Sequence, residues 1–239
     1  MIGTSPAVRL QLCVGLSLAL AGFSAQAQLI GALQGRSHVS PLANTPVDGV
    51  MGIVTAVDAN GFWMQDAGDG DDLTSDAVYV FRGSAGSKPV IGDAVSVRGR
   101  VQEFRPGNNA GNLTTTQINA TGSFAGAWNL LSSNNALPAP KVIDLGFLPP
   151  AMIAPAVGNV ETAAGPLQPQ LYSMDFYESL EGMRVTMPSA QAVSPTNRFG
   201  EIALVASAQV GSPDSVWTPR GGVALAPGNF NGQRLMIDD

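Results

Sequence analysis

The sequence concentrates its carboxylates in one short loop. Five of them fall within the eleven residues 66–76: Asp66, Asp69, Asp71, Asp72 and Asp76. Alternating acidic positions with glycine between them are typical of a calcium loop, because hard oxygen ligands must curl around one ion. Two interpretations stay open. Either the aspartates and glycines simply make the turns of a solvated loop, or a Ca²⁺ site is formed by Asp66, Asp69, Asp71 and Asp76.

A second candidate site combines arginines with aromatic side chains. Its members are Trp63, Tyr79, Arg98, Arg100 and Arg105. The first two arginines alternate outward on one predicted strand, and the aromatic residues belong to predicted strands that can lie beside it. Guanidinium groups next to exposed aromatic rings form a stacking platform for nucleic acid. The alternative is a solvated strand face, which the 6 basic and 9 acidic side chains of residues 28–120 favour.

Groups that would support enzymatic catalysis are scarce. The chain has one histidine, His38, and one cysteine, Cys13, with no nucleophile elbow, phosphate-binding glycine loop or zinc-type spacing. We interpret His38 as a structural polar residue. Only the acidic loop could hold a catalytic metal, and no general base accompanies it. An enzyme in its own right is therefore the less favoured class.

The first 27 residues have the pattern of a secretory leader. Arg9 precedes an apolar run over residues 10–23, and Ala25-Gln26-Ala27 supplies the small residues of a cleavage site. We predict cleavage after Ala27 and export from a bacterial cell, to the periplasm or the medium. The run is shorter than the roughly 20 residues of a membrane span, so we expect no membrane anchor. Cys13 would leave with the leader.

Residues 28–120 carry the clearest strand pattern. Five predicted strands cover residues 47–57, 62–65, 77–81, 93–104 and 113–118. Asn60-Gly61 is a strong hairpin signal, and Gly99 in the middle of a strand indicates a bend at a barrel corner. Five strands in about 75 residues predict a mostly β fold with an OB-fold-like barrel. An SH3-like barrel or half of a sandwich also fits the pattern.

The remainder of the chain changes character. Residues 121–171 are rich in proline and alanine, and we predict a connector that wraps over the barrel. Residues 172–239 predict a partial second β (OB-like) module, with a helical turn at 175–181 and strands near 183–187, 201–206 and 229–239.

Composition excludes several classes of protein. The 239 residues include 28 Gly and 17 Pro, which is unfavourable for a helical bundle, and are 45% apolar, which is too much for a disordered chain. The net charge of −6 argues against broad electrostatic binding to DNA, although a local basic face is compatible with it.

Several segments together resemble the N-terminal, non-catalytic region of large secreted bacterial nucleases. They are IGALQGRSHVSPL (30–42), GIVTAV (52–57), NGFWMQD (60–66), VYVF (78–81), NLTTTQI (112–118), FYESLEGM (176–183) and PGNFN (227–231). The resemblance implies an OB-fold-like module ahead of a catalytic domain of the endonuclease/exonuclease/phosphatase superfamily, which acts on DNA with a divalent metal. The Gly-Asp-x-Asn segment and the paired histidines of that catalytic domain are absent from this sequence. No catalytic residue can be transferred.

We therefore expect a non-catalytic region of a secreted extracellular nuclease that binds nucleic acid or positions the substrate. The expected partners are DNA and a C-terminal nuclease catalytic domain in a chain that continues past residue 239. The alternative is a structural module, with or without bound Ca²⁺, that packs on the catalytic domain or the cell surface without touching nucleic acid. The acidic balance favours that alternative.

Overall fold

The computed structural model describes residues 28–122, 127–156 and 158–238. The predicted leader, with Arg9, Cys13 and the cleavage site after Ala27, lies outside these residues. The described chain is mostly β, with two short α-helices, α1 (Ile30–Gln34) and α2 (Ser173–Glu178). In this part of the chain, no helix has the length and apolar character that a membrane crossing requires.

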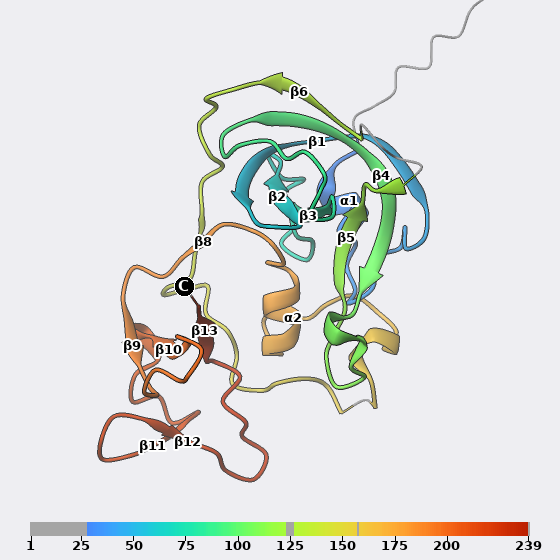
Figure 1. Cartoon of the computed structure of the whole chain (residues 1–239). Helices are drawn as coiled ribbons and strands as arrows, with labels where there is room; N and C mark the ends of the chain where they lie inside the picture. The colour runs from blue at the N-terminus through green and yellow to red at the C-terminus, as the bar shows by residue number, and fades with distance from the viewer. Residues whose placement is uncertain (1–27, 123–126, 157, 239) are drawn as a thin grey trace, which may run out of the picture.

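Five strands close into a barrel (Figure 1). They are β1 (Pro46–Val57), β2 (Gly61–Gln65), β3 (Ala77–Phe81), β4 (Ala94–Phe104) and β5 (Thr115–Asn119). The order is β1-β2-β3-β5-β4, and β4 pairs back with β1. All pairs are antiparallel except β3 with β5, which is parallel. The predicted OB-like barrel is confirmed.

Alternation along the strands fills the barrel. Val95, Val97 and Val101 of β4 are fully buried, while Arg98 and Arg100 between them are exposed. The other large fully buried side chains of this core include Phe62, Met64, Ile118, Val50, Val54, Val78 and Val80. Period-two burial of this kind is what packs one face of each strand inside a barrel.

Two glycine signals of the sequence correspond to real constraints. A Cβ on Gly99 would collide with the Ile118 side chain and lie 2.7 Å from the carbonyl oxygen of Asn119, so only glycine lets β5 approach β4 this closely. The β1–β2 turn is held by Asp58, whose Oδ1 accepts the backbone N–H groups of Asn60 at 2.8 Å and Gly61 at 2.6 Å.

The predicted connector contributes strands of its own. β6 (Trp128–Ser132) adds to β4 beside the barrel, and β7 (Lys141–Val142) pairs in parallel with β8 (Val185–Thr186). The short 3₁₀ turns are η1 (Pro106–Asn108), η3 (Val160–Thr162) and η4 (Ser207–Gln209). β6 is a short apolar run whose strand state depends on its pairing with β4, which sequence pattern alone does not supply.

The C-terminal part forms small sheets next to α2 (Figure 1). β10 (Ile202–Ala206) pairs with β9 (Ala190–Ala192) and β13 (Leu235–Ile237), and β11 (Val216–Trp217) pairs with β12 (Val223–Ala224). Helix α2 has its own small core, in which Phe176 packs on Phe147 with ring centroids 4.7 Å apart.

Candidate binding groove on the barrel

The strand register builds a row of aromatic and amide side chains across the outside of the barrel. Trp63 of β2 lies opposite Tyr79 of β3, Tyr79 lies opposite Gln117 of β5, and Gln117 lies opposite Gln102 of β4. Because side chains alternate between the two faces of a strand, residues paired in one row share a face. The neighbouring positions on β3, Val78 and Val80, are buried in the core, so this row faces outward.

A second outward row runs beside the first. It joins Gly61, Phe81, Asn119 and Arg100 in the same strand order. On the other side of the first row, Phe104 of β4 lies opposite Thr115 of β5. The outer face therefore carries aromatic rings on β2 and β3, and amides together with Phe104 on β5 and β4.

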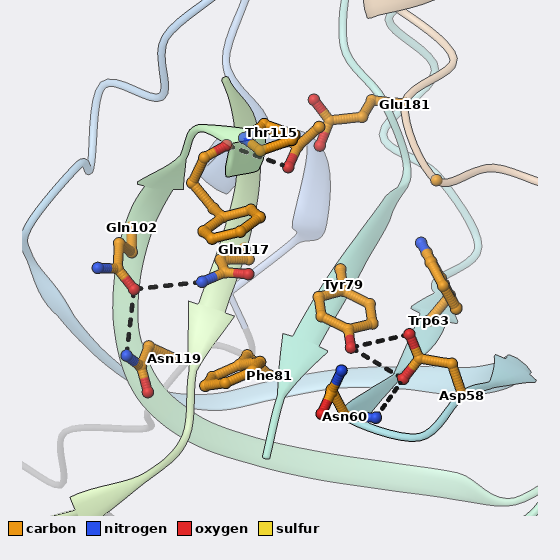
Figure 2. Close-up of a pocket in the computed structure, with 13 residues that line it drawn as sticks. Asp58, Asn60, Trp63, Tyr79, Phe81, Gln102, Thr115, Gln117, Asn119 and Glu181 are labelled. Carbon is orange, nitrogen blue, oxygen red and sulfur yellow. Dashed lines mark hydrogen bonds between the residues drawn. The ribbon is translucent and has the colours of Figure 1, made fainter. Parts of the chain in front are cut away.

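These rows line a groove of about 640 Å³ (Figure 2). Its lining residues are Asp58, Asn60, Trp63, Tyr79, Phe81, Gln102, Phe104, Pro106, Thr115, Gln117, Asn119, Glu181 and Gly182. The volume is that of a typical small-ligand site, and apolar walls with a few polar groups are the usual composition of such sites. Among these described lining residues there is no Lys or Arg.

Tyr79 is held in place from two sides. Its ring centroid lies 4.7 Å from that of Trp63, at an interplanar angle of 54°. Its hydroxyl donates to the Asp58 carboxylate, 2.9 Å from Oδ1. A Cβ on Gly61 would lie 2.6 Å from the Tyr79 hydroxyl oxygen, so the Tyr79 side chain occupies space that only glycine leaves free. Burial and the Asp58 carboxylate raise the pKa of Tyr79, which keeps the phenol neutral.

The groove carries little net charge at neutral pH. Burial raises the pKa of Glu181 to about 9, and the charges of Glu178 and Glu103 act in the same direction. Glu181 is therefore protonated near pH 7. Asp58 is then the one charged lining residue at neutral pH among those described, and it already accepts two backbone N–H groups and the Tyr79 hydroxyl.

One wall of the groove comes from far along the sequence. The turn after α2 brings Gly182 against Trp63, where a Cβ on Gly182 would lie 3.2 Å from Trp63 Cδ1. Gly182 also has a left-handed φ of 70°, which favours glycine. The Ser75 hydroxyl donates to the Glu181 carbonyl oxygen at 2.6 Å and the Glu181 carboxyl accepts the Thr116 N–H at 2.9 Å, so the turn is fixed to the barrel.

Of the five residues predicted for nucleic-acid binding, the structure brings Trp63 and Tyr79 together in the groove and places the three arginines outside its lining. Arg100 is the nearest in register, opposite Asn119, and its guanidinium donates to the Asn44 carbonyl. Arg98 lies exposed further along β4. The two aromatic residues thus lie together in the groove, while the three arginines lie outside its lining.

Arg105 is engaged in a different contact. Its guanidinium pairs with Glu161 at 2.5 Å. Burial alone would raise the pKa of Glu161, but Arg105 and the hydrogen bonds from Thr114 lower it. Arg105 thus fastens the β4–β5 loop to the connector.

The lining residues that were not predicted from the sequence include Phe81, Gln117, Asn119 and Glu181. The first three could have been found from alternation, because they share a face with Tyr79 and Gln102 once the strands are in register. Glu181 carries no such signal, since its place depends on how α2 packs against the barrel.

The aspartates of the acidic loop are held largely by the loop itself. Asp66 accepts the backbone N–H of Ile30 at 2.8 Å, and Asp69 accepts the Thr74 hydroxyl at 3.1 Å. Asp71 pairs with Arg36 at 2.5 Å. Within the loop, Asp66, Asp69 and Asp71 also each accept the backbone N–H group two residues further on, as in a turn-rich loop whose carboxylates cap backbone groups.

Asp76 lies close to two of these carboxylates. Burial raises its pKa, and the charges of Asp66 and Asp69 add to the effect. In the described part of the chain, no group of three or more His, Cys, Asp or Glu residues has an arrangement that could hold a metal ion. Calcium binding by Asp66, Asp69, Asp71 and Asp76 stays a prediction.

His38 joins the segment before the barrel to α2. It is buried, with its two ring nitrogens 2.8 Å from Asp175 Oδ1 and 3.0 Å from Glu178 Oε2. Burial alone would lower the pKa of His38, but the hydrogen bonds and charges of Glu178 and Asp175 raise it. Both ring nitrogens lie within hydrogen-bond distance of carboxylates, so His38 ties the segment before the barrel to α2.

A family model described as a domain of unknown function (DUF8508) matches residues 142–239. The match covers α2, the C-terminal sheets and the turn with Glu181 and Gly182, and leaves the barrel strands outside it. No curated protein and no solved structure matches the chain. The resemblance to secreted nucleases stays a prediction.

Proposed function

We propose that the barrel is a non-catalytic binding module that holds single-stranded nucleic acid in the groove, with the bases inside and the phosphates outside. The observation that carries this proposal is the row Trp63, Tyr79, Gln117 and Gln102, which crosses four adjacent strands on one face. OB-type barrels bind chain ligands on this kind of face.

Stacking supplies most of the proposed affinity. Trp63, Tyr79, Phe81 and Phe104 offer aromatic surface to unpaired bases, and such stacking contributes about 1–3 kcal/mol per base. The amides of Gln102 and Gln117 can hydrogen-bond to base edges. Bases in a duplex are already stacked and paired, so a groove of this chemistry favours single strands.

The absence of Lys and Arg from the described lining determines the orientation proposed for the strand. Phosphates gain nothing from a groove without cations, whereas Arg100 beyond Asn119 offers a guanidinium at the rim. Because few phosphates are neutralised, the logarithm of the binding constant should fall only gently with the logarithm of salt concentration, by about −0.7 for each contacted phosphate.

The nuclease resemblance supplies the biological setting of the proposal. A secreted nuclease that degrades DNA would use such a module to hold a frayed or single-stranded segment near a C-terminal catalytic domain. In this proposal DNA is the ligand and the catalytic domain is the partner, and the module itself performs no chemistry.

The test is binding measured by fluorescence anisotropy. Labelled single-stranded DNA, single-stranded RNA and duplex DNA of equal length are titrated with purified residues 28–239 at two salt concentrations. Trp63→Ala should weaken single-strand binding about tenfold or more. The matched control is Phe199→Ala, which removes an aromatic side chain that is 62% exposed and lies outside the groove.

Two results would contradict the proposal. One is the absence of binding to all three nucleic acids. The other is equal loss of affinity in the Trp63 and Phe199 variants. A neutral oligosaccharide belongs in the same series, because aromatic rings and amides also suit sugars. If only the oligosaccharide binds, the groove belongs to a different class of ligand.

The second candidate function is the structural module. Apolar side chains are exposed on the C-terminal part, with Phe199 at 62%, Leu225 at 66% and Phe230 at 60%. Such side chains suit packing against another domain. Co-elution of residues 28–239 with a separately produced catalytic domain, abolished by Phe230→Ser and unaffected by Trp63→Ala, is the result expected for this function.

A further inference from the structure

The amides at the groove have orientations that a chain of hydrogen bonds determines. The chain begins at Thr121, whose backbone N–H donates to Asn119 Oδ1 at 3.1 Å and whose hydroxyl donates to the same oxygen at 2.7 Å. A backbone N–H can only donate, so this end of the Asn119 amide must be its carbonyl oxygen. The NH₂ group of Asn119 therefore points the other way.

The orientation of the Asn119 amide determines the amide orientations of Gln102 and Gln117. Asn119 Nδ2 donates to Gln102 Oε1 at 3.1 Å, and Gln117 Nε2 donates to that same oxygen at 3.2 Å (Figure 2). Gln102 must present its oxygen to both. The NH₂ of Gln117 is thus bound toward Gln102, and its carbonyl oxygen is turned away from Gln102, to the side where Tyr79 lies.

This carbonyl oxygen belongs to a buried side chain whose amide is held by Gln102. Gln117 is only 5% exposed, although it lines the groove. Tyr79, its partner in the register, gives its hydroxyl proton to Asp58 and so offers only lone pairs to a ligand. At the middle of the groove the protein therefore presents hydrogen-bond acceptors.

We propose that Gln117 selects bases that carry an exocyclic amino group, so that the groove prefers cytosine over uracil or thymine. This inference rests on the proposed function. The amino group of cytosine would donate to Gln117 Oε1. Uracil has a carbonyl oxygen at the same ring position, so in the same pose two acceptors would face each other without a proton, and its N3–H would reach Gln117 Oε1 only after a shift of the base. A site that is built for a donor at one position discriminates against a ligand that carries an acceptor there.

The test compares oligo-dC with oligo-dU of twelve nucleotides by fluorescence anisotropy. The measurement is made at pH 8, where cytosine is neutral. One hydrogen bond gained or lost predicts about three- to tenfold tighter binding of oligo-dC to the wild-type chain.

Two variants of Gln102 separate orientation from simple contact. Gln102→Met removes the oxygen that holds Gln117, so the Gln117 amide can rotate. The ratio of the binding constants for oligo-dC and oligo-dU should then fall close to one. Gln102→Glu keeps that oxygen and adds a charge, so both ligands should bind more weakly while the preference is retained. Gln117→Met removes the acceptor itself and should also abolish the preference.

The outcomes distinguish this inference from the proposed function. Equal binding of oligo-dC and oligo-dU to the wild-type chain overturns the inference and leaves single-strand binding standing. Preference retained in both Gln102→Met and Gln117→Met overturns it as well. Binding of neither oligonucleotide overturns the inference together with the proposed function.

Discussion

The carboxylates of the acidic loop illustrate how one residue type can serve two purposes. Asp66 and Asp69 accept hydrogen bonds from their own loop and its neighbour, yet their charges add to the effect of burial in raising the pKa of Asp76. A cation bound among them would remove this repulsion. The loop is therefore the place where the calcium prediction can be tested residue by residue.

Calcium at about a hundred times its Kd would add about 2.7 kcal/mol to the free energy of unfolding. For a chain of this size that corresponds to a rise of about 5–10 °C in melting temperature. Asp69→Ala combined with Asp71→Ala should abolish the rise in calorimetry. Asp48→Ala, which removes an exposed aspartate from β1, should leave it unchanged. If calcium does not raise the melting temperature of the wild-type chain, the loop is a turn and no metal site.

At the scale of elements, the groove depends on how closely β2 and β3 approach each other at Gly61. A Cβ at that position would meet the Val80 carbonyl and the Tyr79 ring. Gly61→Ala should lower the free energy of unfolding in urea by about 1–3 kcal/mol, the usual effect of overpacking. It should also displace Tyr79 and weaken ligand binding.

The control for this prediction is Gly158→Ala. Nothing lies within 4 Å of the Cβ it would add, and its φ is outside the left-handed region. Its effect on stability should stay within about 0.5 kcal/mol. A similar loss in the free energy of unfolding of Gly61→Ala and Gly158→Ala would show that the close packing at Gly61 does not cause the destabilisation.

The barrel strands were predictable because their signals are local. Alternating valines define β4, and Asn60-Gly61 marks the hairpin between β1 and β2. The sequence also placed Trp63 and Tyr79 on strands that can lie beside the arginine strand, and their shared outward face follows from the strand register. The alternation could not show that Arg98 lies outside the groove, because that depends on how the barrel closes. It also gave no sign of Glu181, which reaches the groove only through the packing of α2.

Across the whole molecule, two titratable groups lie where α2 and its following turn contact the N-terminal part of the described chain. His38 contacts Asp175 and Glu178 of α2, and Glu181 accepts the Thr116 N–H of β5. The carboxylates raise the pKa of His38, while burial raises that of Glu181 to about 9. Both groups thus bind protons more tightly in the folded chain than in the unfolded one.

The consequence is a chain that loses stability as the pH rises. His38 stabilises the fold fully below its unfolded pKa of about 6.5, and this contribution disappears as the pH passes its raised folded pKa. Glu181 ionises in the unfolded chain above about 4.5 and in the folded chain only near 9, so it lowers stability across that interval. Each group contributes a slope of up to about 1.4 kcal/mol per pH unit between its two pKa values.

Urea unfolding at pH 6, 7, 8 and 9 measures this slope. Glu181→Gln keeps an oxygen for the Thr116 N–H and has no proton to lose. The free energy of unfolding of the variant should therefore fall less steeply with pH than that of the wild type, and the variant should be more stable than the wild type at pH 8–9. Asp48→Asn, at an exposed position of β1, should leave the slope unchanged. Parallel pH profiles for the wild type and Glu181→Gln would mean that Glu181 is ionised in the folded chain. The groove would then carry a second negative charge at neutral pH, and its proposed preference for bases over phosphates would become stronger still.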